Sequence, residues 1–251
     1  MNFDEKIANA SKKNQTRIIL ALDIEDPDPQ RLVSRSQDIL WKVKDFICAV
    51  KINRQLILTL GLRGIADSVL KVADDYSLPT IMDAKVNDVG HTNGFMARLY
   101  FDAGFDGIIA SPIAGWDNGL DTVFEIARAR ERAVLLLTYM SNPGAEAFYS
   151  LMATAGKGPV KPVFEILANL ATEWKANGVI VGATKPEIIT RVRELIGPSL
   201  PIYSPGVGVQ GGDAKRAVDA GATYLIVGRS IYGATDPAKS AKTIREMVFA
   251  S

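Results

Sequence analysis

One short segment of the chain carries charged residues at a spacing that suits proton transfer. Residues 83–88 read Asp-Ala-Lys-Val-Asn-Asp, so that Asp83 and Lys85 are two positions apart and Asp88 follows in the next loop. In an extended strand, positions two apart point to the same face. Burial alone lowers the pKa of a lysine, whereas flanking carboxylates raise it. The segment therefore predicts that Lys85 is an ammonium that donates a proton, and not a Schiff-base nucleophile.

Two glycine-containing segments nearer the end of the chain are suited to binding an anion. Residues 204–213 read Ser-Pro-Gly-Val-Gly-Val-Gln-Gly-Gly-Asp, and residues 227–230 read Val-Gly-Arg-Ser. Glycines let backbone amides approach a phosphate closely, and Arg229 can engage it with two hydrogen bonds. Ordinary turns are the alternative. Residues 206–211 also match the dinucleotide fingerprint G-x-G-x-x-G, but the match follows the seventh predicted strand, and no acidic residue ends the eighth.

The other reactive residue types are scarce. His91 is the only histidine and Cys48 the only cysteine, so no cluster with the spacing of zinc ligands exists. We expect His91 to be a loop or helix-start residue and Cys48 to be a buried core thiol. A single thiol forms no internal disulfide, which fits a reducing, cytoplasmic compartment. Lys157 lacks the spacing and the following Ser or Thr of a P-loop.

Charge and hydropathy exclude several classes of partner. The chain has 29 basic and 28 acidic side chains, whereas a nucleic-acid-binding surface usually shows a basic excess. The longest apolar run, residues 133–137, is far too short to span a membrane, and residues 1–15 contain no apolar stretch of signal-peptide length. We therefore expect a soluble protein that binds neither nucleic acid nor membranes.

Short apolar runs alternate with amphipathic segments along the whole chain. The predicted strands are residues 17–23, 47–52, 80–85, 107–111, 133–138, 178–182, 201–204 and 224–228. The predicted helices are residues 29–44, 62–76, 92–103, 119–130, 160–176, 185–195, 213–220 and 237–249, with an extra helix over residues 4–11. Near-continuous apolar strands are typical of a parallel sheet that is covered on both faces. The pattern predicts an α/β fold, a single (β/α)8 TIM barrel over residues 1–251; an open sheet of six to eight strands is the alternative.

Such a barrel would bring the candidate residues to one end, because its active site lies at the carboxyl ends of the strands. Asp23 ends the first predicted strand and Lys51 comes near the end of the second, beside the segment from Asp83 to Lys85. A network of alternating charges is tolerated there, whereas an isolated buried charge is costly. An ion-pair network that only stabilises the rim remains the alternative.

One long irregular stretch, residues 139–159, follows the fifth predicted strand. Connections of this length are usually functional lids or disordered segments. Ser141 lies at its start, at the predicted catalytic end of the barrel, and is therefore a candidate ligand contact. The sequence Ser-Asn-Pro-Gly over residues 141–144 is equally consistent with a simple turn.

These segments resemble the orotidine 5′-phosphate decarboxylases, particularly the compact archaeal-type branch. Residues 83–89 are similar to that family's D-x-K-x-x-D pattern with an apolar residue after it. The similarity also includes residues 22–23, 50–52, 140–145, 204–208 and 228–232. The resemblance implies a TIM barrel that converts orotidine 5′-phosphate to uridine 5′-phosphate (UMP) in pyrimidine biosynthesis, without a metal or an organic cofactor.

The resemblance also assigns roles by position. The implied catalytic residues are Lys51, Asp83, Lys85 and Asp88. The implied substrate-binding residues are Asp23, Lys51, Thr92, Ser141, Pro205, Gln210, Gly228 and Arg229. Lys85 would protonate C6 of the pyrimidine. Asp23 and Thr92 would contact the ribose, Ser141 the ring, and Gln210 and Arg229 the phosphate. In this family the site lies at a homodimer interface, and the residues that match Asp88 and Thr92 come from the partner subunit.

Two other functions stay open, and one residue pair departs from the family pattern. Sister enzymes such as 3-keto-L-gulonate 6-phosphate decarboxylase share D-x-K-x-x-D but use magnesium, held by an acidic residue at the end of the second strand. Lys51 occupies that place here and would repel a divalent cation. A non-catalytic barrel that binds a nucleotide is the other alternative. Val89-Gly90 stands where many relatives carry Ile-Pro, and we expect the glycine to loosen the loop that bears Asp88.

Overall fold

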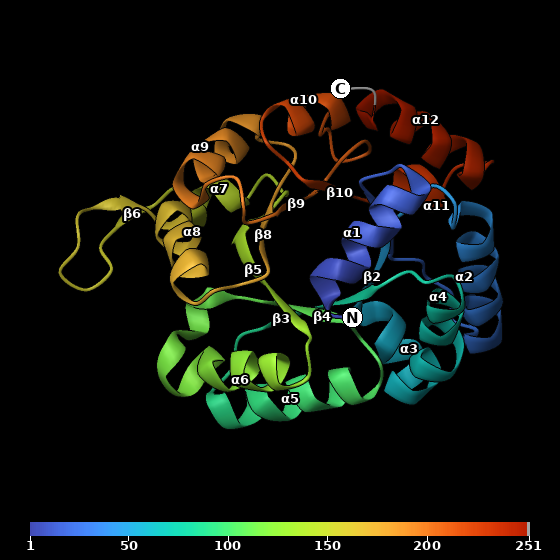
Figure 1. Cartoon of the computed structure of the whole chain (residues 1–251), viewed down its shortest axis with the longest axis horizontal. Coiled ribbons are helices and arrows are strands. Elements are labelled where there is room, and N and C mark those ends of the chain that lie inside the picture. Colours follow the sequence, from blue (N-terminus) through green and yellow to red (C-terminus); the bar gives the residue numbers. More distant parts are fainter. Residues whose placement is uncertain (250–251) are drawn as a thin grey trace.

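The computed structural model describes residues 1–249 and contains a closed barrel of eight parallel strands (Figure 1). The barrel strands are β1 (Ile18–Leu22), β2 (Ala49–Asn53), β3 (Thr80–Val86), β4 (Gly107–Ala110), β5 (Ala133–Tyr139), β8 (Gly178–Val181), β9 (Ile202–Pro205) and β10 (Tyr224–Val227). Each strand pairs with its neighbours in chain order, and β10 closes the barrel against β1. The predicted TIM barrel is therefore confirmed, and every predicted strand is present.

Helices surround the barrel and create two apolar layers. The ring consists of α2 (Pro29–Val43), α3 (Arg54–Ile65), α4 (Lys71–Asp75), α5 (Gly90–Asp102), α6 (Asp121–Ala129), α8 (Val163–Glu173), α9 (Pro186–Ile196), α10 (Ala214–Asp219) and α12 (Pro237–Phe249). One layer lies between strands and helices, and the other fills the barrel interior. Strand residues are buried on both faces, which explains their near-continuous apolar sequence.

The predicted extra helix is present as α1 (Phe3–Asn14), and it closes one end of the barrel (Figure 1). Phe3 and Ile7 belong to the apolar cluster of the barrel interior. The carboxylate of Asp106 fixes the helix to the strands: it accepts hydrogen bonds from Lys6 Nζ at 2.7 Å and from the backbone N–H of Thr80 at 2.9 Å. Phe3 contacts Gly107 at the start of β4, so α1 covers the amino ends of the strands. Because α1 covers the amino ends, the carboxyl ends of the barrel strands remain available for a functional site.

Two of the segments that differ from the predictions lie after β2 and after β5. The helix predicted from residue 62 begins at Arg54, and it continues through a π-helical turn, η1 (Ala66–Leu70), into α4. Its first part buries only Leu56, leaves Leu58 86% exposed and is broken at Gly61 (φ 69°), so its apolar period is weak.

The second difference concerns the irregular stretch after β5. It contains the short helix α7 (Ala145–Tyr149) and the strand β6 (Met152–Ala153), which pairs with β7 (Lys161–Pro162) in a hairpin that projects from the ring (Figure 1). Because β7 occupies residues 161–162, α8 begins three residues later than predicted. These elements are too short for their sequence period to be recognised.

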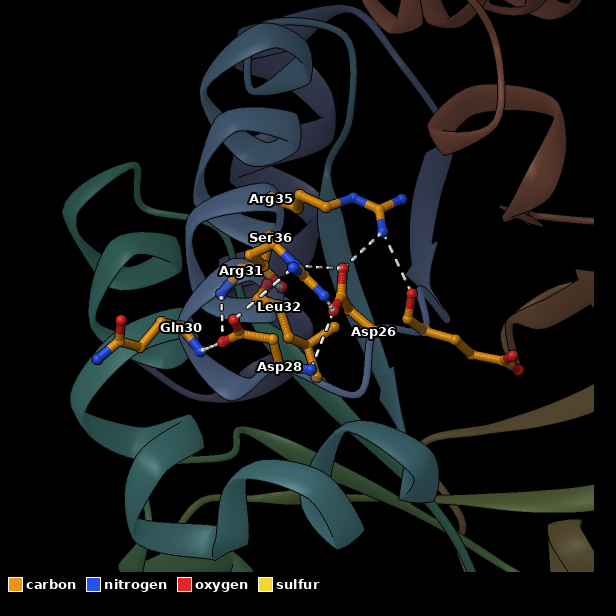
Figure 2. Close-up of polar contacts among 8 residues, drawn as sticks. Asp26, Asp28, Gln30, Arg31, Leu32, Arg35 and Ser36 are labelled. Carbon is orange, nitrogen blue, oxygen red and sulfur yellow. Dashed lines mark hydrogen bonds and ion pairs between the residues drawn. The ribbon is translucent and has the colours of Figure 1, made fainter.

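Side-chain hydrogen bonds hold the loop that follows β1. Asp28 caps α2 by accepting from the backbone N–H groups of Gln30 at 2.8 Å and of Arg31 at 3.3 Å (Figure 2). Asp26 accepts from the guanidinium of Arg31 at 3.0 Å and lies 3.6 Å from that of Arg35. N-terminal capping and these ion pairs fix the chain directly after the end of β1, where Asp23 lies.

Candidate active site

A cavity of about 190 Å³ lies at the carboxyl ends of the barrel strands. Its floor consists of interior residues such as Ile109, Leu137 and Ile226. Its lining also includes the predicted site residues Asp23, Lys51, Asp83, Lys85, Ser141, Pro205, Gln210, Gly228 and Arg229. Asp88 and Thr92 are the predicted site residues that do not line it. One chain thus brings together the charged segment of β3 and the loops after β9 and β10.

Four charged side chains of alternating sign form a continuous network on one wall. The carboxylate of Asp83 accepts from Lys51 Nζ at 2.8 Å and from Lys85 Nζ at 2.6 Å. Lys51 Nζ also lies 3.5 Å from a carboxylate oxygen of Asp23. Lys51 is only 4% exposed and Asp83 only 6%. The predicted network is therefore present, with Asp83 bridging two ammonium groups.

The network keeps its buried members charged. Burial opposes the charge of Lys51, but the carboxylates of Asp83 and Asp23 outweigh it and raise the pKa of Lys51 above its ordinary value. Burial likewise opposes the charge of Asp83, but the two ammonium groups outweigh it and hold the pKa of Asp83 below its usual range. Both groups are therefore ionised at neutral pH.

The backbone at Lys85 departs from a regular strand. Lys85 has φ of 48°, and the pairing of β3 with β4 shifts register between Met82 and Val86. Both Asp83 and Lys85 still line the cavity, as strand alternation predicts. A non-glycine residue in the left-handed region costs free energy and persists only where its surroundings hold it, typically at functional sites.

Three glycines of the loop after β9, Gly206, Gly208 and Gly212, are required by the close packing of the loop. A Cβ on Gly206 (φ 96°) would lie 2.7 Å from Ser141 Cβ, and one on Gly208 (φ 81°) would overlap Ser230 Oγ. The N–H of Gly208 donates to the carbonyl of Gly212 at 2.8 Å, and the N–H of Gly212 donates to the carbonyl of Gly206 at 3.0 Å. The sequence-based expectation that these amides face an anion is therefore wrong for Gly208 and Gly212.

The loop after β10 offers other donors for an anion. Arg229 begins a short helix that was not predicted, α11 (Arg229–Tyr232), and its side chain is exposed on the cavity rim. The first amides of a helix have no acceptor within the helix, which leaves those of Arg229 and Ser230 available. Arg229 and the start of α11 are thus the better candidates for holding a phosphate.

A hydrogen bond joins two loops over the cavity. Ser141 Oγ donates to Gln210 Oε1 at 2.7 Å, which links the loop after β5 to the loop after β9. Thr184 Oγ1 donates to the carbonyl of Ser141 at 3.1 Å and holds the first loop from behind. Two residues predicted from separate segments are therefore direct neighbours.

Asp88 and Thr92 lie outside the cavity, on the side of the barrel where β3 leads into α5. Asp88 is exposed, and one of its carboxylate oxygens accepts from the N–H of Val89 at 2.7 Å. Large apolar side chains are also exposed on α5, just before it, and on the neighbouring segments α3 and η2 (Pro112–Ala114); this set, called the α5 patch, comprises Leu58, Val89, Phe95, Leu99 and Ile113. Neither Asp88 nor Thr92 lines the cavity of its own chain.

Two further cavity residues were missed in the sequence. Asn53 follows Lys51 by two positions at the end of β2, so strand alternation would have identified it. Tyr232 comes one turn after Arg229 in α11. Its pKa is raised, mainly by burial and then by Asp23, so its hydroxyl stays a neutral hydrogen-bond donor.

The minor candidates lie where they were expected. Cys48 is fully buried in the barrel interior, where burial raises the pKa of its thiol, and His91 is exposed in the first turn of α5. Within residues 1–249, no three His, Cys, Asp or Glu side chains are grouped so that they could hold a metal ion. Over the same range, none of the helices has the length and apolar character needed to cross a membrane.

Comparisons with known proteins agree with this geometry. A family model described as "Orotidine 5′-phosphate decarboxylase / HUMPS family" matches residues 16–244. The orotidine 5′-phosphate decarboxylase of Methanosarcina acetivorans is 37% identical over 94% of this chain and 96% of its own length. The crystal structure of orotidine 5′-monophosphate decarboxylase from Methanocaldococcus jannaschii complexed with the inhibitor BMP is 29% identical, with a TM-score of 0.77 over 93% of this chain and 98% of that one.

A second solved structure, Leishmania donovani OMP decarboxylase, aligns with a TM-score of 0.86 over 100% of this chain and 98% of that one, at 25% identity. The structural similarity thus extends over the whole barrel. The chain belongs to the orotidine 5′-phosphate decarboxylase / HUMPS family.

Proposed function

We propose that this protein decarboxylates orotidine 5′-monophosphate to UMP in pyrimidine biosynthesis, with no metal or organic cofactor. The observation that carries the proposal is the network Asp23–Lys51–Asp83–Lys85, which lies on the wall of the same cavity as Arg229. The network supplies a cation for the reacting carbon, and Arg229 supplies one for the phosphate. The single buried thiol is consistent with a cytoplasmic location, which we include in the proposal.

Decarboxylation requires a positive charge that is in position before the bond from C6 to the carboxyl group breaks. When the bond from C6 to the carboxyl group breaks, carbon dioxide leaves and the electron pair stays on C6, in the ring plane, where the ring π-system does not delocalise it effectively. The Lys85 ammonium stabilises this pair as it develops and then transfers its proton to C6. The amine regains a proton from solvent. Because the charge appears only on the way to the transition state, a preorganised ammonium lowers the barrier without merely tightening substrate binding.

Lys51 and Asp83 hold that ammonium in place. Asp83 contacts both lysines, and Lys51 is almost fully buried behind it. Fixed neighbours avoid reorganisation at the moment of reaction. At the other end of the substrate, Gln210 and Arg229 would hold the phosphate, with Pro205 and Gly228 lining the same side.

The other predicted binding residues would contact the ribose and the pyrimidine, which lie between the phosphate and the reacting carbon. Asp23 would accept from a ribose hydroxyl, and Ser141 would contact the pyrimidine. The hydrogen bond from Ser141 to Gln210 would let binding of the phosphate also position the loop over the ring. Binding energy from the remote phosphate would thereby order the charged site.

Turnover of orotidine 5′-phosphate in EDTA tests the proposal directly. We expect the purified protein to show the absorbance change of decarboxylation at the same rate with and without the chelator, because Lys51 occupies the position where the magnesium-dependent relatives carry an acidic ligand. Activity that is lost in EDTA and restored by magnesium would instead support a metal-dependent phosphosugar enzyme. Tight binding of the nucleotide without any turnover would support a non-catalytic barrel.

We further propose that the enzyme is a homodimer in which Asp88 and Thr92 complete the partner subunit's site. The α5 patch supports this proposal: Leu58 is 86% exposed, Val89 59% and Phe95 55%, and exposed apolar side chains of this size are suited to burial in an interface. Asp88 is exposed, directly precedes Val89 in the chain and does not line the cavity of its own chain, so a second chain on the patch is the direct way to use it.

Mixing two inactive variants tests the shared site. A Lys85→Ala subunit and an Asp88→Asn subunit together form one site with an intact Lys85 and an intact Asp88. We expect mixed dimers to regain activity well above the sum of the two separate proteins. Subunit exchange is verified by native mass spectrometry with one tagged chain. No gain despite proven exchange would mean that Asp88 does not act across the interface.

A further inference from the structure

Asn93 is buried, with 0% of its surface exposed, in the first turns of α5, and its side chain holds both backbone groups of Asp88. Its Oδ1 accepts from the N–H of Asp88 at 2.8 Å, and its Nδ2 donates to the carbonyl of Asp88. The same Nδ2 donates to the carbonyl of Gly119 at 2.8 Å, in the π-helical segment η3 (Trp116–Leu120) that follows β4. One side chain thus ties the Asp88 backbone to a neighbouring βα unit.

The loop is held from its other side as well. A Cβ on Gly90 would lie 2.9 Å from Asn118 Oδ1 and 3.0 Å from backbone atoms of Asn118, so no larger residue fits there without a shift. Thr122 Oγ1 donates to the carbonyl of Gly90 at 3.1 Å. The expectation that Gly90 loosens this loop is therefore wrong: the glycine permits close packing against Asn118.

The side chain of Asp88 has far less support of its own. It is exposed, and the contact it makes within the chain is the short-range bond from the N–H of Val89. Its direction therefore depends on the backbone that Asn93 holds. Because reacting groups must be placed within a fraction of an ångström, a residue that fixes this backbone controls where the carboxylate reaches.

We propose that Asn93 is a positioning residue for catalysis, acting through Asp88 on the partner subunit's site and not on the site of its own barrel. This inference rests on the proposed function and on the shared site. It assigns Asn93 a role distinct from fold stability, because the effect of its loss is delivered across the interface.

The first test is the activity of Asn93→Ala. We expect kcat/KM to fall about 10-fold to 100-fold, as displacement of a catalytic group by about 1 Å produces. Asn177→Ala is the matched control: Asn177 likewise accepts from a backbone N–H, that of Val134 at 3.0 Å, and donates to Asp4 at 2.9 Å, but outside the cavity. The control should lose stability without a comparable loss of activity. Unchanged kcat/KM in Asn93→Ala would overturn the proposal.

Subunit mixing supplies a readout that a purely structural role would not change. A mixture of Asn93→Ala with Lys85→Ala should regain activity, since one site then combines an intact Lys85 with an Asp88 held by an intact Asn93. A mixture of Asn93→Ala with Asp88→Asn should regain none, since both variants impair the same contribution. If Asn93→Ala fails to fold, Gly90→Ala displaces the same loop and is expected to give the same mixing pattern.

The results of these mixtures distinguish the role of Asn93 from the shared site on which that role depends. If Asp88→Asn regains activity with Lys85→Ala but Asn93→Ala does not, Asn93 acts within its own barrel and the inference is overturned while the shared site stands. If even the Asp88→Asn mixture regains nothing, the shared site itself fails, and the role of Asn93 across the interface fails with it.

Discussion

Lys85→Ala is expected to reduce kcat by more than the roughly 10²–10³-fold that removal of one preorganised electrostatic group usually costs. The reason is that one substitution removes two functions, the counter-charge for the electron pair on C6 and the proton that ends the reaction. The structure places Lys85 Nζ 2.6 Å from Asp83 and on the wall of the cavity, so no other side chain repeats its position. The other cation of the network, Lys51, is buried and held between Asp83 at 2.8 Å and Asp23 at 3.5 Å.

The fold should survive this change. Asp83 keeps its 2.8 Å contact with Lys51 when Lys85 is removed, so no buried charge loses its last partner. UMP should still bind to the variant, because the proposed phosphate contacts, Gln210 and Arg229, do not involve Lys85. Lys215→Ala, which removes an exposed lysine paired with Asp219 on α10, is the control and should retain full activity. A Lys85→Ala protein with most of its turnover would contradict the assignment of the proton donor.

Arg229→Ala is expected to lower kcat/KM by about 100-fold or more, equivalent to about 2.7 kcal/mol of lost transition-state stabilisation. Arg229 is exposed on the cavity rim at the start of α11, and it is the cation that the proposal places on the phosphate. Charge-assisted contacts between arginine and phosphate are among the stronger hydrogen bonds in proteins. A loss below about tenfold, or ~1.4 kcal/mol, would contradict a phosphate-binding role.

A truncated substrate separates phosphate binding from a general defect. Orotidine, which lacks the phosphate, should react slowly and at the same rate in Arg229→Ala as in the unaltered protein, because nothing remains for Arg229 to hold. Arg63→Ala is the matched control, since Arg63 is an exposed arginine on α3 that pairs with Asp67. If Arg229→Ala also impaired the turnover of orotidine, Arg229 would act on the charged network or on the fold instead.

The sequence was informative where one local rule determined the outcome. Strands buried on both faces read as apolar runs, and the ends of parallel strands must meet, so Asp23, Lys51 and Asp83 could be placed at one rim from their positions alone. The same rule would have identified Asn53. The helix from Arg54 was predicted to start too late because Leu58 is exposed and only Leu56 in its first turns is buried, so the apolar period that marks a helix is missing.

The site was harder to predict where distant segments decide a local conformation. The loop glycines after β9 were expected to present amides to an anion, but the N–H groups of Gly208 and Gly212 bond within the loop, and a Cβ on Gly206 would collide with Ser141, which no local pattern reveals. The loop at Gly90 was expected to be loose because a glycine is locally flexible. The contacts that hold it come from Asn93 and from Asn118 on another βα unit, and the local sequence does not reveal them. The positions of Asp88 and Thr92 outside the cavity likewise depend on the closed barrel, and their use by a second subunit remains a proposal.

The central claim is that the ammonium of Lys85 meets the electron pair on C6, and a crystal structure with UMP bound measures it most directly. The account predicts C6 of the product about 3–3.5 Å from Lys85 Nζ, the separation of groups poised to react, with the phosphate on Arg229 and the start of α11. A pyrimidine ring that binds with C6 turned away from Lys85, or a phosphate held elsewhere on the barrel, would contradict it.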